Sequence, residues 1–263
     1  MPEVAAWLAI GAATGFFAGL LGIGGGTILV SSLALMFAAQ AVPPAYVMHM
    51  AIGTSLAAIV AGAWASLRTH HRHGAVDWPV VRAMAPGVLV GALTAGVASR
   101  WFSTGFLKTF FLAFLVFVTA QMVFGFKPKS GRALPGRAGL AGTGAFIGAS
   151  SSLFGGGAAA AGVPFLTWCG MTMHNAIGTV SAIGFPLAIA GAIGYVIAGW
   201  GIAGLPRWSA GFVYVPAFVV ISAASMLVAP FGARLAHRLK GPTLRRIFAV
   251  FLLAIGAKVA ISV

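Results

Sequence analysis

The sequence contains very little charge. Only 7% of its 263 residues are Asp, Glu, Lys or Arg, and 60% are hydrophobic, whereas an ordinary soluble domain has about 25% charged residues. No charged residue occurs between Glu3 and Arg68 or between Arg137 and Arg207. Because about 20 apolar residues are enough for one helix to cross a bilayer, these stretches exclude a soluble enzyme, a secreted disulfide scaffold, a disordered tail and a coiled coil. The sequence predicts a polytopic helical membrane protein.

Acids and cysteines are scarcest. Two acids, Glu3 and Asp77, oppose sixteen Lys and Arg residues, which gives a formal charge of +14. Neither acid lies within an apolar segment, and this disfavours a cation substrate or a carboxylate sodium site. The one cysteine, Cys169, excludes an internal disulfide and a multi-cysteine metal centre. The sequence also lacks a nucleophile with an acid–base partner and an ATP-binding motif, so we expect no enzyme activity, no cofactor and no metal.

The basic residues gather in short segments between apolar runs. This pattern is typical of the cytoplasmic loops of membrane proteins, and nucleic-acid binding is a poor second interpretation. We therefore expect a multi-pass protein of the cytoplasmic (inner) membrane whose partners are the lipid bilayer and a small anion. A homodimer is compatible with the sequence. The amino terminus lacks the basic region and cleavage site of a signal peptide, so the first apolar segment is expected to remain.

An internal repeat organises the chain. The segment 49–54, His-Met-Ala-Ile-Gly-Thr, matches 174–179, His-Asn-Ala-Ile-Gly-Thr, at an offset of 125 residues. A glycine cluster precedes each segment, at 22–26 and at 155–157. Further matches lie at an offset of 130 residues: Trp78 with Trp208, and Pro86 with Pro216. The common order indicates duplication, with repeats at 4–126 and 138–262 joined by a basic cytoplasmic linker at 127–137.

Each repeat contains four apolar segments, and the first segment of each is unusual. The segments lie at about 4–38, 44–67, 79–99 and 105–126, and at about 138–168, 172–199, 208–232 and 243–262. Each first segment is too long for one ordinary span, too short for two, and broken centrally by glycines. Backbone that leaves the helix at membrane depth must be buried in protein or line a cavity, because lipid cannot satisfy its polar groups.

The positive charges indicate how these segments cross. If all eight segments span once, eight basic residues lie on one side and seven on the other. If both broken segments return as re-entrant hairpins, the division becomes eleven to four, with Arg82 left out. The positive-inside rule favours the second arrangement, with both termini outside, although two short crossings would give the same parity. We therefore predict an all-α polytopic membrane protein of two inverted repeats. Each repeat is a glycine-broken re-entrant hairpin followed by three transmembrane helices.

The broken segments and the repeated Gly-Thr segments supply the candidate site. Glycine lets backbone N–H groups converge on a ligand, and a helix that starts after the cluster directs its positive end at an anion. The candidate substrate-binding residues are Gly24, Gly25, Gly26, Thr27, Gly53, Thr54, Ser55, Gly155, Gly156, Gly157, Gly178, Thr179 and Ser181. The alternative is that such glycines serve close helix packing. We prefer that alternative for Gly91 and Gly96.

Polar side chains near these segments are the remaining candidates. Ser150, Ser151 and Ser152 precede the second cluster and offer neutral donors, although such hydroxyls often bond their own helix. His49 and His174 are titratable groups inside uncharged runs, and together with Asn175 they are candidates for proton or anion contact. The alternative role for both histidines is to cap a helix near the headgroups.

Two glycine-rich stretches resemble a known family. Gly22-Ile-Gly-Gly-Gly-Thr-Ile-Leu-Val and the stretch from Phe154-Gly-Gly-Gly to Gly162-Val-Pro, with the Ala-Ile-Gly-Thr segments, resemble the sulfite exporter TauE/SafE family. The sequence departs from that family at Ser31, where a proline is common, whereas Pro164 keeps the proline in the second repeat.

The resemblance implies secondary transport of sulfite, sulfate, thiosulfate or an organosulfonate across the cytoplasmic membrane. We expect alternating access, in which one half moves against the other around a central site. Proton coupling is a hypothesis motivated by the two histidines. A passive anion channel is the alternative function, and the residues fit import as well as export.

Overall fold

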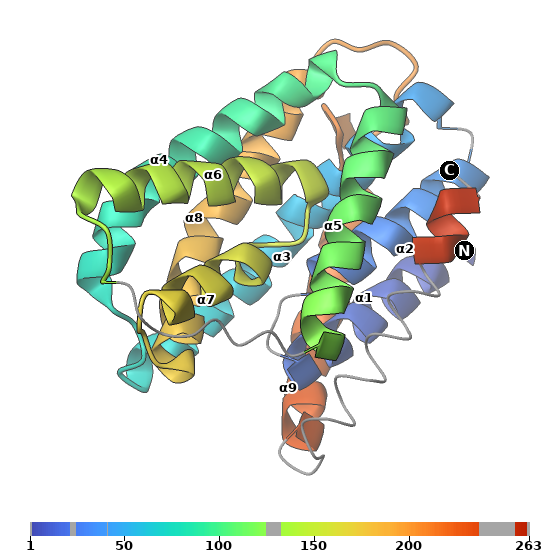
Figure 1. The fold of residues 1–263 in the computed structure, drawn as a ribbon. Coiled ribbons are helices and arrows are strands. Elements are labelled where there is room, and N and C mark those ends of the chain that lie inside the picture. Colours follow the sequence, from blue (N-terminus) through green and yellow to red (C-terminus); the bar gives the residue numbers. More distant parts are fainter. Residues whose placement is uncertain (1, 22–24, 41, 125–132, 237–255, 262–263) are drawn as a thin grey trace.

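The computed structural model describes residues 2–21, 25–40, 42–124, 133–236 and 256–261 (Figure 1). Within these ranges the chain is almost entirely helical, as predicted. The helices are α1 (Pro2–Leu21), α2 (Gly26–Ala39), α3 (Val47–Arg72), α4 (Trp78–Ala98), α5 (Thr104–Phe124), α6 (Arg137–Phe154), α7 (Ala159–Trp168), α8 (Met173–Gly199) and α9 (Val215–Ala236). Two 3₁₀ turns, η1 (Pro44–Tyr46) and η2 (Ser99–Trp101), precede α3 and follow α4. Residues 256–261 are also helical.

Several of these helices have the length and apolar composition of membrane spans. Four described helical stretches qualify: Pro44–Arg72, Trp78–Trp101, Thr104–Gln121 and Met173–Gly199. Shorter apolar helices occupy Glu3–Phe17, Gly26–Ala39, Ala159–Trp168 and Val215–Ala229. The apolar segment predicted at 44–67 continues as helix to Arg72, and the chain turns at Gly74, where φ is +67°. The predicted spans at 79–99 and 172–199 are matched closely by α4 and α8.

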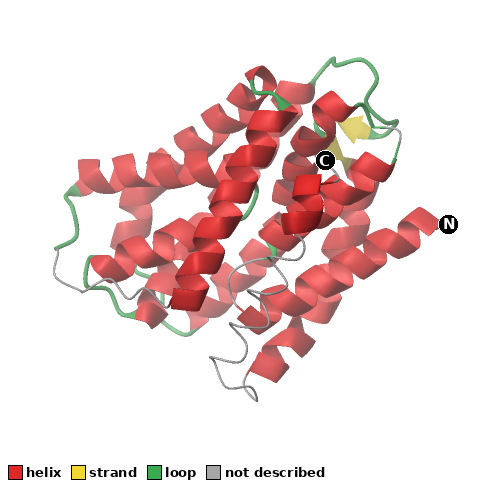
Figure 2. Ribbon diagram, turned by 45° about the vertical axis from the view of Figure 1, so that its right-hand side comes forward, coloured by secondary structure: helices red, strands yellow, loops and turns green. Residues whose placement is uncertain are grey.

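The seventh predicted segment, at 208–232, is partly wrong. Its first residues form two short antiparallel strands, β1 (Ser209–Ala210) and β2 (Val213–Tyr214), and α9 begins only at Val215. Figure 2 shows this strand pair at one end of the helical bundle. The cause is a tight turn that hydropathy does not detect: Trp208 has a φ of +71°, and a Cβ on Gly211 would overlap the backbone of Val196.

The start of α9 also corrects the alignment of the repeats. Pro79 is the second residue of α4, and Pro216 is the second residue of α9. Proline is well tolerated there because the first helical N–H groups have no intrahelical partner. Position in the helix therefore pairs Pro216 with Pro79, 137 residues away, and not with Pro86 as the offset of 130 suggested. The inverted relation of the two repeats stays a prediction.

Both glycine-broken segments form two helices that reverse direction. In Figure 1, α7 turns back beneath α6, and α2 returns toward the end of the molecule where α1 begins. Helix α6 stops because Gly155 adopts a left-handed conformation with a φ of +70°, and its N–H group donates to the carbonyl oxygen of Ser151. The first break includes residues 22–24, which lie outside the described residues.

Helices of different repeats pack most closely on one another. Helix α1 lies along α9, and α6 lies along α4. Glycines four residues apart allow both contacts: a Cβ on Gly11 would lie 2.8 Å from Ala224 Cβ, and one on Gly148 would lie 3.0 Å from Val88 Cα. Gly15 lies four residues after Gly11, and Gly144 lies four residues before Gly148. This spacing of small residues is typical of closely packed membrane helices.

The packing role preferred for Gly91 and Gly96 is confirmed. A Cβ on Gly91 would lie 2.9 Å from Ala145 Cα on α6, and one on Gly96 would lie 3.0 Å from Gly194 Cα on α8. Helix α3 of the first repeat also packs on α8 of the second repeat, so the two repeats share one core.

Candidate functional site

The tips of the two hairpins meet inside the protein. Gly26, the first residue of α2, lies against Gly155 and Gly156, which follow α6. A Cβ on Gly26 would overlap the carbonyl oxygen of Gly155 and would lie 2.8 Å from Gly156 Cα. The structure thus brings together the two glycine clusters that the sequence singled out. Gly24 lies outside the described residues.

Ser55 joins the two tips. Its hydroxyl lies 3.3 Å from the carbonyl oxygen of Gly26 and 3.3 Å from that of Gly155, and the side chain is fully buried. One hydroxyl hydrogen serves both acceptors, so α3 connects the first hairpin to the second through a single shared donor. By sequence offset Ser55 corresponds to Val180, whose methyl groups pack at Gly162.

The helices that leave the tips begin without side-chain caps. Gly25 is the N-cap of α2 and Ala158 is the N-cap of α7, and neither supplies a capping hydrogen bond. The first N–H groups of a helix lack intrahelical partners, and they carry about half an elementary positive charge. Two such ends therefore begin beside the contact between Gly26 and Gly155.

Three buried hydroxyl residues lie on the helices that lead into the tips, and the Ser152 hydroxyl lies beside Gly191 of α8. Thr14, Ser151 and Ser152 are 1%, 0% and 0% exposed, and their oxygens have no hydrogen-bond partner among the described residues. Thr14 lies against Gly25: a Cβ on that glycine would be 2.9 Å from the Thr14 carbonyl oxygen. Sequence reasoning missed Thr14, although it is the only hydroxyl residue between Glu3 and the first glycine cluster.

The repeated Gly-Thr segments hold loops of the opposite repeat. The hydroxyl of Thr54 accepts a 3.0 Å hydrogen bond from the Tyr214 N–H group, and the hydroxyl of Thr179 accepts one of the same length from Asp77. Both threonines are fully buried. The two contacts are reciprocal, because Asp77 precedes α4 and Tyr214 precedes α9.

The neighbouring glycines allow these loops to approach. A Cβ on Gly53 would lie 2.9 Å from the Phe212 carbonyl oxygen, and one on Gly178 would lie 2.7 Å from the Ala75 carbonyl carbon. The four Gly-Thr residues therefore contact the loops before α9 and α4, whereas the hairpin tips are contacted by Ser55.

The two histidines of the repeat have different surroundings. His49 is 2% exposed, and its Nε2 lies 3.0 Å from the Ser99 carbonyl oxygen and 3.1 Å from that of Phe102. Because both neighbours are acceptors, Nε2 is the protonated nitrogen, and His49 binds the carbonyl end that follows α4. His174 and Asn175 are exposed at the start of α8, and the His174 ring lies 6.5 Å from that of His70.

Three other candidates are Ser181, Thr27 and Gly157. Ser181 accepts a 3.2 Å hydrogen bond from Ser66. Thr27 is buried in the first turn of α2, and its carbonyl oxygen accepts from Ser31. Gly157 follows the second tip with a φ of +82° and has open space around it. Of these three, Thr27 and Gly157 lie in sequence beside the tips.

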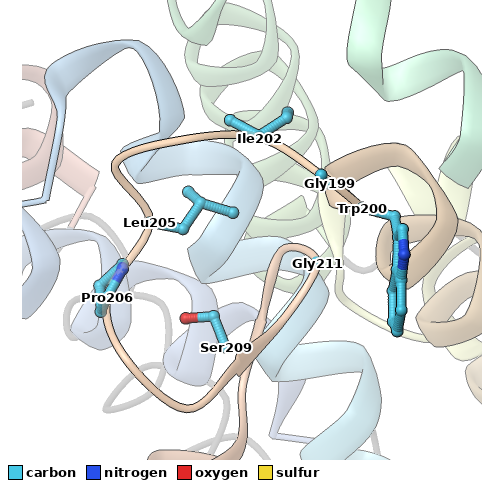
Figure 3. A pocket seen from close by; sticks show the side chains of 8 residues that line it. Gly199, Trp200, Ile202, Leu205, Pro206, Ser209 and Gly211 are labelled. Carbon is cyan, nitrogen blue, oxygen red and sulfur yellow. The ribbon is translucent and has the colours of Figure 1, made fainter.

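A separate pocket of about 230 Å³ lies at the end of α8. Figure 3 shows Leu205, from the loop that follows α8, and Ser209, from β1, on the inner side of the same bend of the chain. The pocket is lined by Gly199, Trp200, Gly201, Ile202, Leu205, Pro206, Ser209 and Gly211. None of these side chains is charged, and none of these residues was a candidate from the sequence. The hairpin tips are the better candidate for an anion site, because two helices begin there without side-chain caps and Thr14 packs against Gly25.

Membrane-length helices around two broken hairpins, with uncharged buried tips in contact, are typical of multi-pass membrane transporters. The family model described as "Sulfite exporter TauE/SafE" matches residues 7–259. The chain therefore belongs to the sulfite exporter TauE/SafE family.

Two curated relatives agree with this class. A "Probable membrane transporter protein" of Haemophilus influenzae is 33% identical over 250 residues, which cover 94% of this chain and 94% of the relative. The "Probable membrane transporter protein YunE" of Bacillus subtilis is 27% identical over 117 residues, which cover 44% of this chain and 40% of the relative. No solved structure matches.

Proposed function

We propose that this protein carries small sulfur-containing anions across the cytoplasmic membrane by alternating access. The class includes sulfite, sulfate, thiosulfate and organosulfonates, in keeping with the family description. The observation that carries the proposal is the contact between the hairpin tips, where Gly26 meets Gly155 and Gly156.

The tips have the chemistry of an anion site. Broken helices that meet at the centre of a transporter direct backbone N–H groups at anionic groups of the substrate. Here α2 and α7 begin at the tips without side-chain caps, and the hydroxyls of Thr14 and Ser151 are buried nearby. The backbone contact between Gly26 and Gly155 leaves no space for a ligand between these two residues. Substrate binding therefore requires the tips to separate, which is the movement that alternating access needs.

The same proposal includes the membrane arrangement. The two repeats are inverted, both glycine-broken segments are re-entrant, and both termini lie on the outer side of the inner membrane. The reciprocal hydrogen bonds of Thr54 and Thr179, and the reciprocal packing of α1 on α9 and α6 on α4, support a twofold relation between the repeats. The excess of basic residues on one side supports the orientation.

Coupling to protons is a further part of the proposal. His49 is the one histidine among the described residues that is buried, and it lies within an uncharged apolar run. Its Nδ1 is buried and has no hydrogen-bond partner in the described part of the chain. This nitrogen can therefore take up a proton during transport.

Counterflow in liposomes tests the proposed function. The full chain is reconstituted, the vesicles are loaded with unlabelled sulfite or methanesulfonate, and uptake of the labelled ion is followed. We expect saturable uptake that is accelerated by the internal ion, because a carrier exchanges faster than it returns empty. Uptake that neither saturates nor accelerates would identify a passive anion channel instead. Empty vesicles are the control, and the absence of flux for both ions would refute the proposal.

A further inference from the structure

We infer that two loops of the chain are the gates of the transport pathway, and that Thr54 and Thr179 are the positioning residues that hold each gate closed. The α8–α9 loop (residues 200–214) closes one end of the pathway, and the α3–α4 loop (residues 73–77) closes the other. The inference rests on the proposed function and specifies how access alternates. It gives the repeated Gly-Thr segments a role in gating in place of contact with the substrate.

The two loops dock on the opposite repeat in the same way. The N–H group of Tyr214 donates to the Thr54 hydroxyl of α3, and the N–H group of Asp77 donates to the Thr179 hydroxyl of α8, both at 3.0 Å. The glycine before each threonine admits the loop backbone. Both threonines are fully buried, so each acceptor is out of reach of water while its loop is docked. Each loop is thus held by one buried side-chain acceptor from the other repeat.

The two docking places lie at opposite ends of the α3–α8 pair, because these helices are antiparallel. Near the start of α3, Gly53 lies against Tyr195, which is close to the end of α8. Near the end of α3, Ser66 donates a hydrogen bond to Ser181, which is close to the start of α8. At a rise of about 1.5 Å per residue, the two threonines lie roughly 20 Å apart along the pair. One loop is therefore placed to open toward each side of the membrane.

The α8–α9 loop adjoins the hairpin tips. Ser55, whose hydroxyl contacts both tips, directly follows Thr54 in the sequence. Phe212 of the loop is fully buried, and its ring lies 4.8 Å from that of His49. The Phe212 N–H group also donates to the Tyr195 carbonyl oxygen at 3.1 Å. This loop therefore seals the end of the α3–α8 pair that is next to the proposed substrate site.

The α3–α4 loop seals the other end with smaller groups. Ala75 is 1% exposed, and its backbone lies against Gly178 of α8. Asp77, the acidic residue of this loop, accepts a hydrogen bond from the first turn of α4 and so holds the loop to that helix. The loop follows Arg68 and Arg72, which the proposed orientation places in the cytoplasm.

The two loops are attached to different helix pairs. The α8–α9 loop leads into α9, which lies along α1, whereas the α3–α4 loop leads into α4, which lies along α6. Movement of one pair therefore draws one loop from its threonine while the other loop stays docked. Alternating access needs this independence, because the two ends of the pathway must not open together.

Single-cysteine accessibility tests the inference. Cys169→Ser removes the native cysteine, and Val213→Cys or Ala75→Cys then places one reporter in each loop. The two positions are 4% and 1% exposed, so each reporter is protected while its loop is docked. The full chain is reconstituted in liposomes, and the rate of reaction with a membrane-impermeant maleimide, supplied on both sides, is measured for each reporter.

The threonine variants release one loop each. We expect Thr54→Val to speed labelling of the Val213→Cys reporter about tenfold, because a docked N–H group loses its buried acceptor. Thr179→Val is expected to do the same for the Ala75→Cys reporter. Neither variant speeds labelling of the reporter in the other loop. Thr54→Ser keeps the hydroxyl and should restore slow labelling. Thr119→Val is the matched control, because that buried hydroxyl bonds within its own helix, α5, and both rates should stay unchanged.

A bulky adduct shows whether a loop must close again during transport. An adduct on the Val213→Cys reporter prevents the α8–α9 loop from docking, so counterflow of sulfite is expected to fall at least about tenfold, which is the loss of the closed state. Ala203→Cys is the matched control, because Ala203 is exposed in the same loop. Its adduct is expected to leave counterflow unchanged.

The outcomes separate the gates from the proposed function. Any other pattern of labelling, in particular a rise at both reporters, would overturn the inference, and so would full counterflow with the adduct on Val213→Cys. If a threonine variant does not fold, Gly53→Ala or Gly178→Ala replaces it, because the added methyl group displaces the same loop. If the parent chain moves neither sulfite nor methanesulfonate, the proposed function itself is wrong.

Discussion

The substitution Gly26→Ala tests the contact on which the candidate site depends. The added methyl group would lie 2.8 Å from Gly156 Cα, whereas ordinary contact begins at 3.4 Å, and it would also overlap the carbonyl oxygen of Gly155. Both neighbours are backbone atoms, which cannot rotate away as a side chain can. The tips must therefore separate by at least about 0.6 Å to relieve the Gly156 contact alone.

Separation of the tips has an energetic cost. Overpacking of a tightly packed interior costs about 1–3 kcal/mol. The Ser55 hydroxyl, already 3.3 Å from each of its two acceptors, would lose at least one of them, and a buried hydrogen bond contributes about 1 kcal/mol. Alanine favours helix over glycine by up to about 1 kcal/mol, which offsets part of the loss. We expect a net destabilisation of about 1–3 kcal/mol, seen as a lower thermal unfolding midpoint in detergent.

Gly62→Ala and Gly142→Ala are the matched controls. Both glycines are exposed within helices, and a Cβ at either position would meet nothing within 4 Å. Alanine at an open position inside a helix stabilises by about 0.5–1 kcal/mol, so these two variants are expected to unfold at a higher temperature. A Gly26→Ala variant as stable as the two controls would show that the tips do not touch, and the reasoning for a site between them would fail.

Three further predictions use the same assays. Thr54→Val and Thr179→Val each leave a loop N–H group without its acceptor, so each is expected to destabilise by about 1–3 kcal/mol, and an effect at only one position would contradict the reciprocal arrangement. Ser55→Ala is expected to lower the unfolding midpoint and to change the rate of counterflow; an unchanged rate would show that the bridge between the tips does not limit their movement. His49→Gln is expected to remove any dependence of uptake on a pH gradient, while His174→Gln, at an exposed position, should preserve it; the opposite result would place the proton site at His174.

The sequence was a good guide where hydropathy alone decides structure. A run of about 20 apolar residues has few solutions in a bilayer, so the spans that became α4 and α8 were predicted closely. Hydropathy marks where the bilayer ends and not where the helix ends, and α3 therefore continues past the predicted limit to Arg72. At 208–214 the residues are apolar but the backbone turns at Trp208, and a hydropathy profile contains no term for a φ of +71°.

The candidate site was predictable as two clusters and not as one contact. The repeated glycines indicated importance, yet nothing in a linear pattern states that Gly26 faces Gly155 or that Ser55 lies between them. Matching motifs also differ in their surroundings: His49 is covered by the end of α4, whereas His174 lies in the first turn of α8 and is exposed. Burial by a distant segment is a tertiary property, so sequence equivalence did not predict it.

The packing also changes which bodies alternating access would move. The sequence suggested that repeat 4–126 moves against repeat 138–262, yet α1 lies along α9 and α6 lies along α4 through glycine contacts between repeats. Sliding at such contacts would drive backbone against backbone, because no flexible side chain separates the helices. The α1–α9 pair and the α4–α6 pair are therefore the natural rigid units, and each contains helices of both repeats. Movement of one pair relative to the other would separate Gly26, which follows α1, from Gly155, which follows α6, at the place where the proposed substrate binds.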